Sequence, residues 1–416
     1  MVPEITADPA YYLPDDWKGA LLVGRVWLPA PMATIAGPTP VVIRPDGVFD
    51  LWPIAPTMAD LLALPHAAIA VREARDLPRI GDVDALIAST FDQGASGGPY
   101  FLAPTDLQPI KACGVTFACS MIERIIEEQA AGDKARAAAT RAAIVDLIGE
   151  DLSKIVPGSP AADELKAELK SRGMWSQYLE VGIGPYAEIF SKSQAMSAVG
   201  LGAEVGLNAL SDWNNPEPEL VLIVNPEGKI VGATLGNDVN LRDIEGRSAL
   251  LLGKAKDNNA SCALGPFIRL LDEQFTLDTI RRMQVDLTIE GDDGFVLQDA
   301  SRLTEISRDV EDLVKQTIGP HHQYPDGFAL MTGTLFAPTA DRNEPGSGFT
   351  HLIGDIVRIS ARELGCLENR VTTSDRAKPW TFGTRALFEQ LHARRTLDAG
   401  SRDTFHGVVG AVEAGR

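Results

Sequence analysis

The sequence is poor in cysteine, in long apolar runs and in positive charge. Four cysteines are scattered over 416 residues without the paired spacing of a metal site: Cys113, Cys119, Cys262 and Cys366. We expect these thiols to be reduced and buried, which suits the cytoplasm. No apolar run approaches the roughly 20 residues that span a bilayer, and the first 30 residues lack the apolar stretch of a signal peptide. The sequence therefore argues against a membrane-spanning protein and predicts a cytoplasmic location.

Lysine and arginine together number 38, against 57 aspartates and glutamates, so the formal net charge is -19. Such a surface repels polyanions, which argues against a nucleic acid or an anionic membrane as a partner. A small anion remains a suitable substrate if its site carries positive charge of its own. Hydrophobic residues make up 45% of the chain, enough for a sizeable core, and the length predicts two domains.

The character of the sequence changes near residue 110. Residues 1–110 combine proline with short apolar runs, and "RPDG" is a turn signal between two of them, so this part is predicted to be a small β-rich domain. Residues 111–395 form the predicted second domain. It includes a helical segment at 120–173, in which apolar residues recur at helical spacing. Residues 396–416 carry no periodicity and are predicted to be a flexible tail.

The predicted second domain is rich in strand signals. "LVLIVNPEGKIVGATLG" (220–236) is predicted to be a hairpin that turns at "NPEG". Other β-like runs include "MQVDLTIEG", "GFALMTGTLFAP" and "GDIVRISA". Because strands follow strands without alternating helices, the sequence predicts a mixed, mostly antiparallel sheet. The expected fold class is therefore α+β and β-rich.

Two carboxylates stand at the head of this hairpin, in "WNNPEPELVLIVN" (213–225). Side chains alternate along a strand, so Glu217 and Glu219 point to the same face as apolar residues that follow them. The returning strand ends at Asp238, which the hairpin would bring back to this pair. Three such oxygen ligands suit Mg²⁺, Mn²⁺ or Ca²⁺, and a cation would offset the cost of burying them. The alternative is a solvent-exposed edge strand, with Asp238 as a turn residue.

Other polar residues nearby have two interpretations each. Lys256 is either a surface lysine or, beside a metal-bound carbonyl, a proton acceptor or electrostatic partner whose pKa is lowered by burial and by the cation. Arg242 either pairs with Asp243 or reaches a substrate carboxylate. Thr332 and Thr334 flank a glycine at a strand end, where hydroxyls bind a ligand as readily as they form a turn.

Five ordered motifs of this sequence together resemble those of the fumarylacetoacetate hydrolase superfamily. They are the pair Glu217 and Glu219, "GNDVNLRD" (236–243), Lys256 nine residues before Gly265 and Pro266, "TGT" (332–334) and "GDIV" (354–357). The resemblance covers roughly residues 110–375. It implies a catalytic domain of mixed β-roll fold, with Mg²⁺ or Mn²⁺ held by Glu217, Glu219 and Asp238. It also implies a homodimer, which is common in the family.

One motif departs from the family pattern. Many hydrolases of the family carry G-x-N-Y-x-x-H-x-x-E, in which a histidine and a glutamate activate water to cleave a carbon–carbon bond. The matching stretch here is "GVTFACSMIE" (114–123), which keeps Glu123 but has Ser120 at the histidine position. Serine does not take a proton from water at neutral pH without help, so the usual hydrolytic base is missing. His321 and His322 could replace it in space, but we do not favour them.

Over roughly residues 15–390, the chain is similar to the branch of bacterial 2-keto-3-deoxy-pentonate dehydratases, which act in xylonate and arabinonate catabolism. The stretches that carry this resemblance are "SQYLEVGIGPYAEIFSK", "WNNPEPE", "GNDVNLRDIEGRSALLLGKAKDNNASCALGPF" and "HQYPDGFALMTGTLFAPTADR". It implies conversion of a 2-keto-3-deoxy-pentonate to 2,5-dioxopentanoate (α-ketoglutarate semialdehyde). We expect Lys256 to act as base and to stabilise an enolate, and Glu123, aided by Ser120, to protonate the departing hydroxyl. The candidate substrate-binding residues are Arg242, Thr334 and Tyr324.

Two other functions stay open. One is a carbon–carbon hydrolase of an acylpyruvate or another diketo acid, with His321, His322 or a water held by Glu123 as base. It predicts pyruvate or another short acid as product. The other is a non-catalytic protein with a structural cation, in which loss of Glu217 would unfold the chain rather than abolish an activity.

Overall fold

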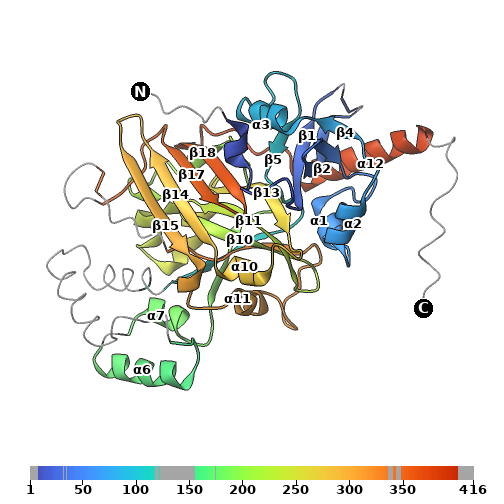
Figure 1. Ribbon diagram of the computed structural model, residues 1–416. Coiled ribbons are helices and arrows are strands. Elements are labelled where there is room, and N and C mark those ends of the chain that lie inside the picture. Colours follow the sequence, from blue (N-terminus) through green and yellow to red (C-terminus); the bar gives the residue numbers. More distant parts are fainter. Residues whose placement is uncertain are drawn as a thin grey trace, which may run out of the picture.

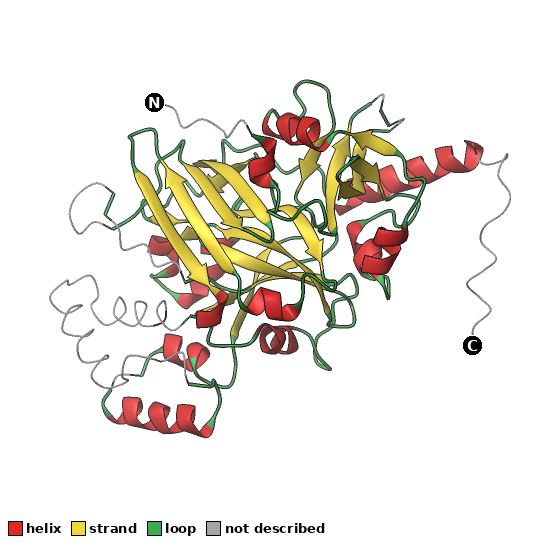
Figure 2. Ribbon diagram, in the orientation of Figure 1, coloured by secondary structure: helices red, strands yellow, loops and turns green. Residues whose placement is uncertain are grey.

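The structure, a computed structural model, is built around two large β-sheets (Figure 1). The residues it describes are 8–30, 32–33, 35–117, 121, 155–173, 175–335, 341–342 and 348–401. Strands form the centre of the molecule, and most of the helices are short segments around them (Figure 2). The α+β, β-rich class expected from the sequence is confirmed.

The larger sheet has 11 strands, and ten of them form one continuous row. In order across the sheet these are β4 (Arg79–Gly81), β3 (Gly47–Asp50), β2 (Gly37–Arg44), β1 (Leu22–Leu28), β13 (Cys262–Leu270), β11 (Ile230–Asp238), β10 (Pro218–Val224), β16 (Phe328–Met331), β6 (Ile110–Gly114) and β7 (Glu188–Ser193). The remaining strand, β5 (Tyr100–Leu102), pairs with β1. All described pairings in this sheet are antiparallel except that of β16 with β6.

The second sheet has five strands, and a separate pair of short strands lies near the start of β10. The five are β15 (Val296–Arg302), β14 (Gln284–Glu290), β17 (Ile356–Ala361), β18 (Gly365–Thr373) and β8 (Glu204–Leu207). The short pair is β12 (Asn240–Leu241) with β9 (Asn214–Asn215). A mostly antiparallel arrangement is again observed, because among these described pairings β18 with β8 is the parallel exception.

The described helices lie outside the two sheets, and most of them are short. The α-helices are α1 (Met58–Leu62), α2 (Ala67–Glu73), α3 (Val83–Phe91), α6 (Pro160–Ser171), α7 (Gln177–Gly182), α8 (Arg242–Glu245), α9 (Leu252–Lys256), α10 (Leu277–Arg281), α11 (Val310–Thr317) and α12 (Thr384–Ser401). Short 3-10 helices lie at η1 (Pro9–Tyr12), η3 (Ala249–Leu251) and η4 (Leu303–Glu305). None of the described helices is both long and apolar enough to cross a membrane.

The core has two layers, one on each face of the larger sheet, and β10 contributes to both. Its residues Leu220 and Leu222 pack between the two sheets, in the same cluster as residues of β14, β17 and β18. The alternate residues Val221 and Ile223 belong to the second cluster, which α1 and α2 help to cover. Every residue of β10 is buried. Because both faces are covered, a charged side chain on this strand needs a compensating partner.

Several local expectations are confirmed. The hairpin of β10 and β11 turns at "NPEG", where the Asn225 side chain accepts a hydrogen bond from the Lys229 N–H at 2.8 Å. "RPDG" joins β2 to β3 as an antiparallel pair. The three cysteines among the described residues are buried and free: Cys113, Cys262 and Cys366. These turns and thiols follow from short-range sequence patterns.

The predicted domain boundaries do not coincide with breaks in the sheet. β1, from the first 110 residues, pairs with β13, so strands from both predicted domains share one sheet. α12 also continues past residue 396, where the tail was predicted to begin. Most of the predicted helical segment at 120–173 lies outside the described residues, whereas α6 and its cap at Ser159 are observed. The division into domains stays a prediction.

Candidate functional site

The β10–β11 hairpin brings the three predicted acids together at its open end. Glu219 pairs with Gly236, and the Asp238 N–H donates to the Glu217 carbonyl at 3.0 Å. One carboxylate oxygen from each of Glu217, Glu219 and Asp238 lies within 4.8 Å of the others. Their exposed fractions are 8%, 2% and 1%. The exposed-edge alternative is therefore wrong, and the acids form a buried cluster, called the acidic cluster below.

Two lysines supply positive charge to this cluster. Lys256, at the end of α9, places its Nζ 2.6 Å from Glu217 Oε2 and 3.1 Å from Asp238 Oδ2. Lys192, on β7, places its Nζ 2.8 Å from Asp238 Oδ1. Both amines are buried, with 2% of Lys256 and 0% of Lys192 exposed. Three carboxylates thus face two lysine amines, so acidic groups outnumber basic groups in the cluster.

Lys192 also fixes the position of Lys256. Its Nζ donates to the carbonyl of Lys256 at 2.5 Å and to that of Val239 at 3.1 Å. The Ser261 hydroxyl donates to the same Lys256 carbonyl at 2.8 Å. The ring of Phe190, two residues before Lys192, lies 5.5 Å from Lys256 Nζ. The end of α9 is thereby anchored to the sheet, and the Lys256 side chain is held against the acids.

Glu219 accepts a hydrogen bond from the backbone of the "TGT" segment. The Gly333 N–H donates to Glu219 Oε2 at 2.5 Å, and the Thr332 hydroxyl donates to the Leu220 carbonyl. Gly333 has a φ of +92°, and a Cβ there would lie 2.0 Å from Thr116 Oγ1. Only glycine fits this approach, which aims the N–H at the carboxylate.

Burial and neighbouring charges shift the pKa values of Glu219 and Lys256. Burial raises the pKa of Glu219 well above its usual value, and the neighbouring charges of Asp238 and Glu217 add to that effect. Burial alone would lower the pKa of Lys256, as expected from the sequence, but Asp238 and Glu217 outweigh it and raise that pKa. Asp238 and Glu217 thus favour the ammonium form of Lys256, and the role of proton acceptor stays a prediction.

A polar shell connects the acidic cluster to α8. The Asn240 amide donates to Glu217 Oε1 at 3.0 Å and to Glu245 Oε2 at 2.6 Å. Arg242, at the start of α8, stacks on the ring of Trp213 with its guanidinium carbon 4.4 Å from the centroid. The neighbouring carboxylate of Asp243 accepts from the Ser211 hydroxyl at 2.7 Å. Arg242 is thus on the element next to the acids, consistent with either of its two interpretations.

The remaining candidates are not all gathered here. Thr334 follows Gly333 and is half-buried. Tyr324 precedes β16, at the end of that strand remote from the acids. Phe328, at the start of β16, pairs with Val224, whereas Met331 pairs with Val221 near the acids.

Tyr324 packs in the core there, its ring 4.7 Å from that of Phe328 and 4.7 Å from that of the exposed His322. His321 is exposed beside His322. The structure therefore does not bring Tyr324 or these histidines to the acidic cluster. Ser120 and Glu123 lie outside the described residues.

The chemistry of the cluster fits a hard divalent cation. Its donors are carboxylate oxygens from three side chains, the ligand type that Mg²⁺ and Mn²⁺ prefer. The raised pKa of Glu219 reflects burial together with mutual repulsion among the three acids. A divalent charge between the carboxylates would remove that repulsion. The residues present are therefore suited to hold such an ion.

Comparison with known proteins identifies the sequence family. Residues 185–372 match the family model of the fumarylacetoacetate (FAA) hydrolase C-terminal region. A probable 2-keto-3-deoxyxylonate dehydratase of Haloferax volcanii is 31% identical over 208 residues, which span 50% of this chain and 68% of the relative. A 2-dehydro-3-deoxy-D-arabinonate dehydratase of Saccharolobus solfataricus is 30% identical over 180 residues, 43% of this chain and 57% of that protein.

Solved structures show the same fold. A 2-keto-3-deoxy-D-arabinonate dehydratase in its apo form has a TM-score of 0.59 at 22% identity, and the match covers 86% of this chain and all 100% of that one. A structure of such a dehydratase complexed with magnesium and 2,5-dioxopentanoate has a TM-score of 0.58 at 21% identity, with the same coverage of 86% and 100%. These likenesses establish the common architecture of the chains.

Proposed function

Because the chain belongs to the fumarylacetoacetate hydrolase family, we propose that it is a hydro-lyase that converts a 2-keto-3-deoxy-pentonate to 2,5-dioxopentanoate and water. The observation that carries this proposal is the buried acidic cluster with Lys256 in contact with two of its members. The names of the two relatives support the substrate class, since both are dehydratases of such sugar acids. The substrate would derive from D-xylonate or an arabinonate.

We propose that Glu217, Glu219 and Asp238 hold Mg²⁺, with Mn²⁺ as the alternative. When bound, such an ion acts as a Lewis acid on the 2-oxo group of the substrate and makes the protons on the third carbon acidic. Support comes from the donor set of the cluster and from a neighbour of the same fold that was solved with magnesium.

We propose that Lys256 stabilises the negative charge of the enolate that forms when the proton of the third carbon leaves. Asp238 and Glu217 raise its pKa and favour the ammonium form that this role requires. A divalent cation on the same carboxylates would lower that pKa, so Lys256 also stays a candidate for the base. Lys192 is a positioning residue, since it holds both Asp238 and the Lys256 carbonyl.

The dehydration needs one proton acceptor and one proton donor. A proton leaves the third carbon, hydroxide leaves the fourth carbon and takes a proton from an acid, and one water is formed. The new double bond between the third and fourth carbons shifts as a proton moves from the fifth carbon to the third, and the resulting enol becomes the aldehyde. We propose Glu123, together with Ser120, for the proton transfers. A homodimer in the cytoplasm completes the proposal.

The decisive experiment offers the purified protein with Mg²⁺ each enantiomer of 2-keto-3-deoxy-pentonate. A semialdehyde dehydrogenase then reports 2,5-dioxopentanoate. We expect product from one enantiomer and a loss of about 100-fold or more in Glu217→Gln, because an essential charge is removed. Glu227→Gln is the matched control, since Glu227 is exposed in the turn of the same hairpin. It should keep full activity.

The same assay separates the alternatives. No product from either enantiomer, with folded protein and bound metal, would refute the dehydratase. Release of pyruvate from an acylpyruvate would then establish a hydrolase. Unfolding of Glu217→Gln that added Mg²⁺ does not reverse, together with the absence of any turnover by the wild type, would indicate a structural cation.

A further inference from the structure

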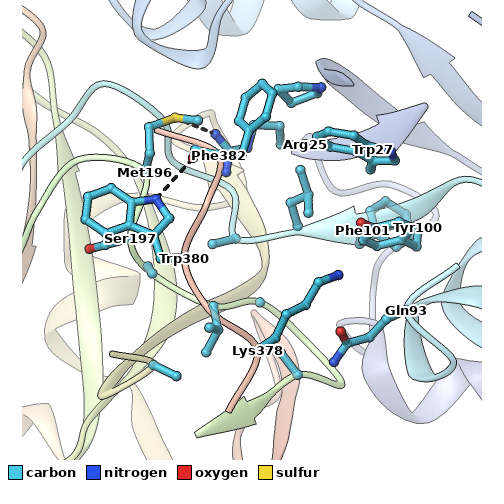
Figure 3. A pocket seen from close by; sticks show the side chains of 18 of the residues that line it. Arg25, Trp27, Gln93, Tyr100, Phe101, Met196, Ser197, Lys378, Trp380 and Phe382 are labelled. Carbon is cyan, nitrogen blue, oxygen red and sulfur yellow. Dashed lines mark hydrogen bonds between the residues drawn. The ribbon is translucent and has the colours of Figure 1, made fainter. Parts of the chain in front are cut away.

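A cavity lies apart from the acidic cluster, lined in part by β1 and β5. Its volume is about 390 Å³, within the range of small-molecule sites. Its walls come from β1, β5, residues 196–203 and residues 378–382, and Figure 3 shows Trp27, Tyr100, Phe101, Trp380 and Phe382 around it. Phe101 is 2% exposed, and the ring of Phe382 packs edge-on against Trp27 at 5.2 Å. Five aromatic side chains thus contribute flat apolar surface to the lining.

A buried arginine in this wall forms no ion pair with a carboxylate of the described residues. Arg25 is 4% exposed, and its Nη1 donates to the sulfur of Met196 at 3.3 Å, a weak acceptor (Figure 3). Its Nε makes no hydrogen bond, and within the described chain no carboxylate forms an ion pair with the guanidinium. The nearby carboxylate of Asp106 accepts instead from the N–H groups of Met58 and Ala59. The charge of Asp106 offsets part of the cost of burying this guanidinium. The Nε still lacks an acceptor, so the wall offers a charged donor to an anionic ligand.

The backbone around the cavity is strained in the same place. Five described residues other than glycine have a positive φ, and three of them line this cavity: Gln93 (52°), Met196 (70°) and Ala260 (58°). Such conformations cost free energy and gather where a fold positions groups for a ligand. Lys378 adds a second cation from the exposed rim, and Figure 3 shows its side chain entering the open space.

We propose that this cavity binds a small organic anion with a planar, apolar body, such as an aromatic carboxylate. The carboxylate would pair with Arg25, which lacks one, and the ring would lie against the aromatic wall. Lys378 attracts the anion at the rim. The site is separate from the acidic cluster, because none of Glu217, Glu219 and Asp238 lines it.

The cavity nevertheless touches the support of Lys256. Asn259 and Ala260 line it, and the next residue, Ser261, donates to the Lys256 carbonyl at 2.8 Å. The Asn259 amide also donates to the Ser374 carbonyl at 3.0 Å, which ties this loop to the segment that carries Lys378. An occupant of the cavity therefore contacts the loop that supports a residue of the acidic site.

The test compares two probes that share a ring but differ in charge, benzoate and benzyl alcohol. Binding is followed by calorimetry and by the fluorescence of the lining residues Trp27 and Trp380. We expect benzoate to bind in roughly the millimolar range and about 10- to 100-fold more tightly than benzyl alcohol, the worth of a charge-assisted hydrogen bond. Arg25→Met should abolish this preference. Arg385→Met, which removes an arginine with a 93% exposed side chain from α12, should keep it.

Three results would overturn the proposal. They are the absence of benzoate binding, equal affinity for the two probes in the wild type, and a preference that survives in folded Arg25→Met. If Arg25→Met does not fold, Lys378→Met decides the matter, because Lys378 is exposed. Benzoate should then bind about threefold more weakly, as for a partly screened charge. Unchanged affinity in that variant would also refute the site. None of these measurements depends on the proposed dehydratase activity.

Discussion

Replacing Lys256 by methionine tests whether the protein needs a positive charge beside the acidic cluster to remain folded. Its Nζ lies 2.6 Å from Glu217 Oε2 and 3.1 Å from Asp238 Oδ2, and all three groups are buried. At an effective dielectric constant of about 20, these contacts are worth about 6 and about 5 kcal/mol before desolvation. Desolvation of the ammonium offsets several kcal/mol of that, so its removal should lower the free energy of unfolding by about 3–5 kcal/mol.

Lys254→Met is the matched control for this substitution. Lys254 lies on the same helix, α9, but is exposed, so its loss should change the free energy of unfolding by about 0.5 kcal/mol or less. The assay is thermal denaturation of both variants and the wild type in the presence of a chelator. We expect the melting temperature of Lys256→Met to fall about 3–6 °C below that of the control.

Added Mg²⁺ should restore part of this loss. An ion that binds the folded state stabilises it, by about 2.7 kcal/mol at a concentration of 100 times its dissociation constant. Methionine leaves one more negative charge of the cluster uncompensated, so Lys256→Met should gain more from Mg²⁺ than the wild type does. Equal melting temperatures of the two variants in chelator would show that Lys256 does not stabilise the folded protein through the acidic cluster. An equal rise of all three melting temperatures with Mg²⁺ would show that Lys256 and the ion do not act on the same charges.

Two further substitutions test other features of the structure. Gly333→Ala should destabilise the protein by about 1–3 kcal/mol more than Gly294→Ala. Both glycines have a positive φ, but a Cβ at position 333 would lie 2.0 Å from Thr116 Oγ1, whereas the space around position 294 is open. Equal melting temperatures of the two variants would contradict this. Burial lowers the pKa of His351 below its usual 6.5. As the pH drops below 6.5, this histidine therefore binds a proton in the unfolded chain but not in the folded chain, and the free energy of unfolding should fall. Melting curves between neutral and mildly acidic pH should show a shallower slope for His351→Gln but not for His392→Gln, which removes an exposed histidine of α12; identical slopes in all three proteins would count against a buried neutral His351.

The hairpin and its acids were predictable because the contacts that form them are local. A short turn joins β10 to β11, and its length fixes the register that returns Asp238 to Glu217. Alternation along β10 then decides which side chains share a face. The strand content and the mostly antiparallel pairing followed from the same short-range patterns. The pairing of β1 with β13 was not predictable, since these strands are more than 200 residues apart.

Three parts of the site depend on contacts that no local pattern carries. In "FSKSQ", Lys192 looks like any surface lysine, and its burial requires the carbonyls of Val239 and Lys256 to converge on it. Gly333 acts through its backbone N–H, a group that nearly every residue has, so the residue type does not reveal this hydrogen bond in the sequence. Tyr324 shares a sequence stretch with the site residues, but the direction of β16 places it at the far end. Closeness in the sequence therefore did not mean closeness in the structure for this residue.

The balance of charge in the acidic cluster explains how a chain with a net charge of -19 can bind an anion. The three carboxylates outnumber Lys192 and Lys256, and Glu245 adds a further acidic group nearby, so the cluster by itself repels an oxo acid. A divalent cation, on the proposed function, adds two positive charges and so favours the carboxylate of the substrate. With neither lysine, the loaded cluster would remain negative. The lysines therefore do not replace the cation; they set the charge that the substrate meets once the cation is bound.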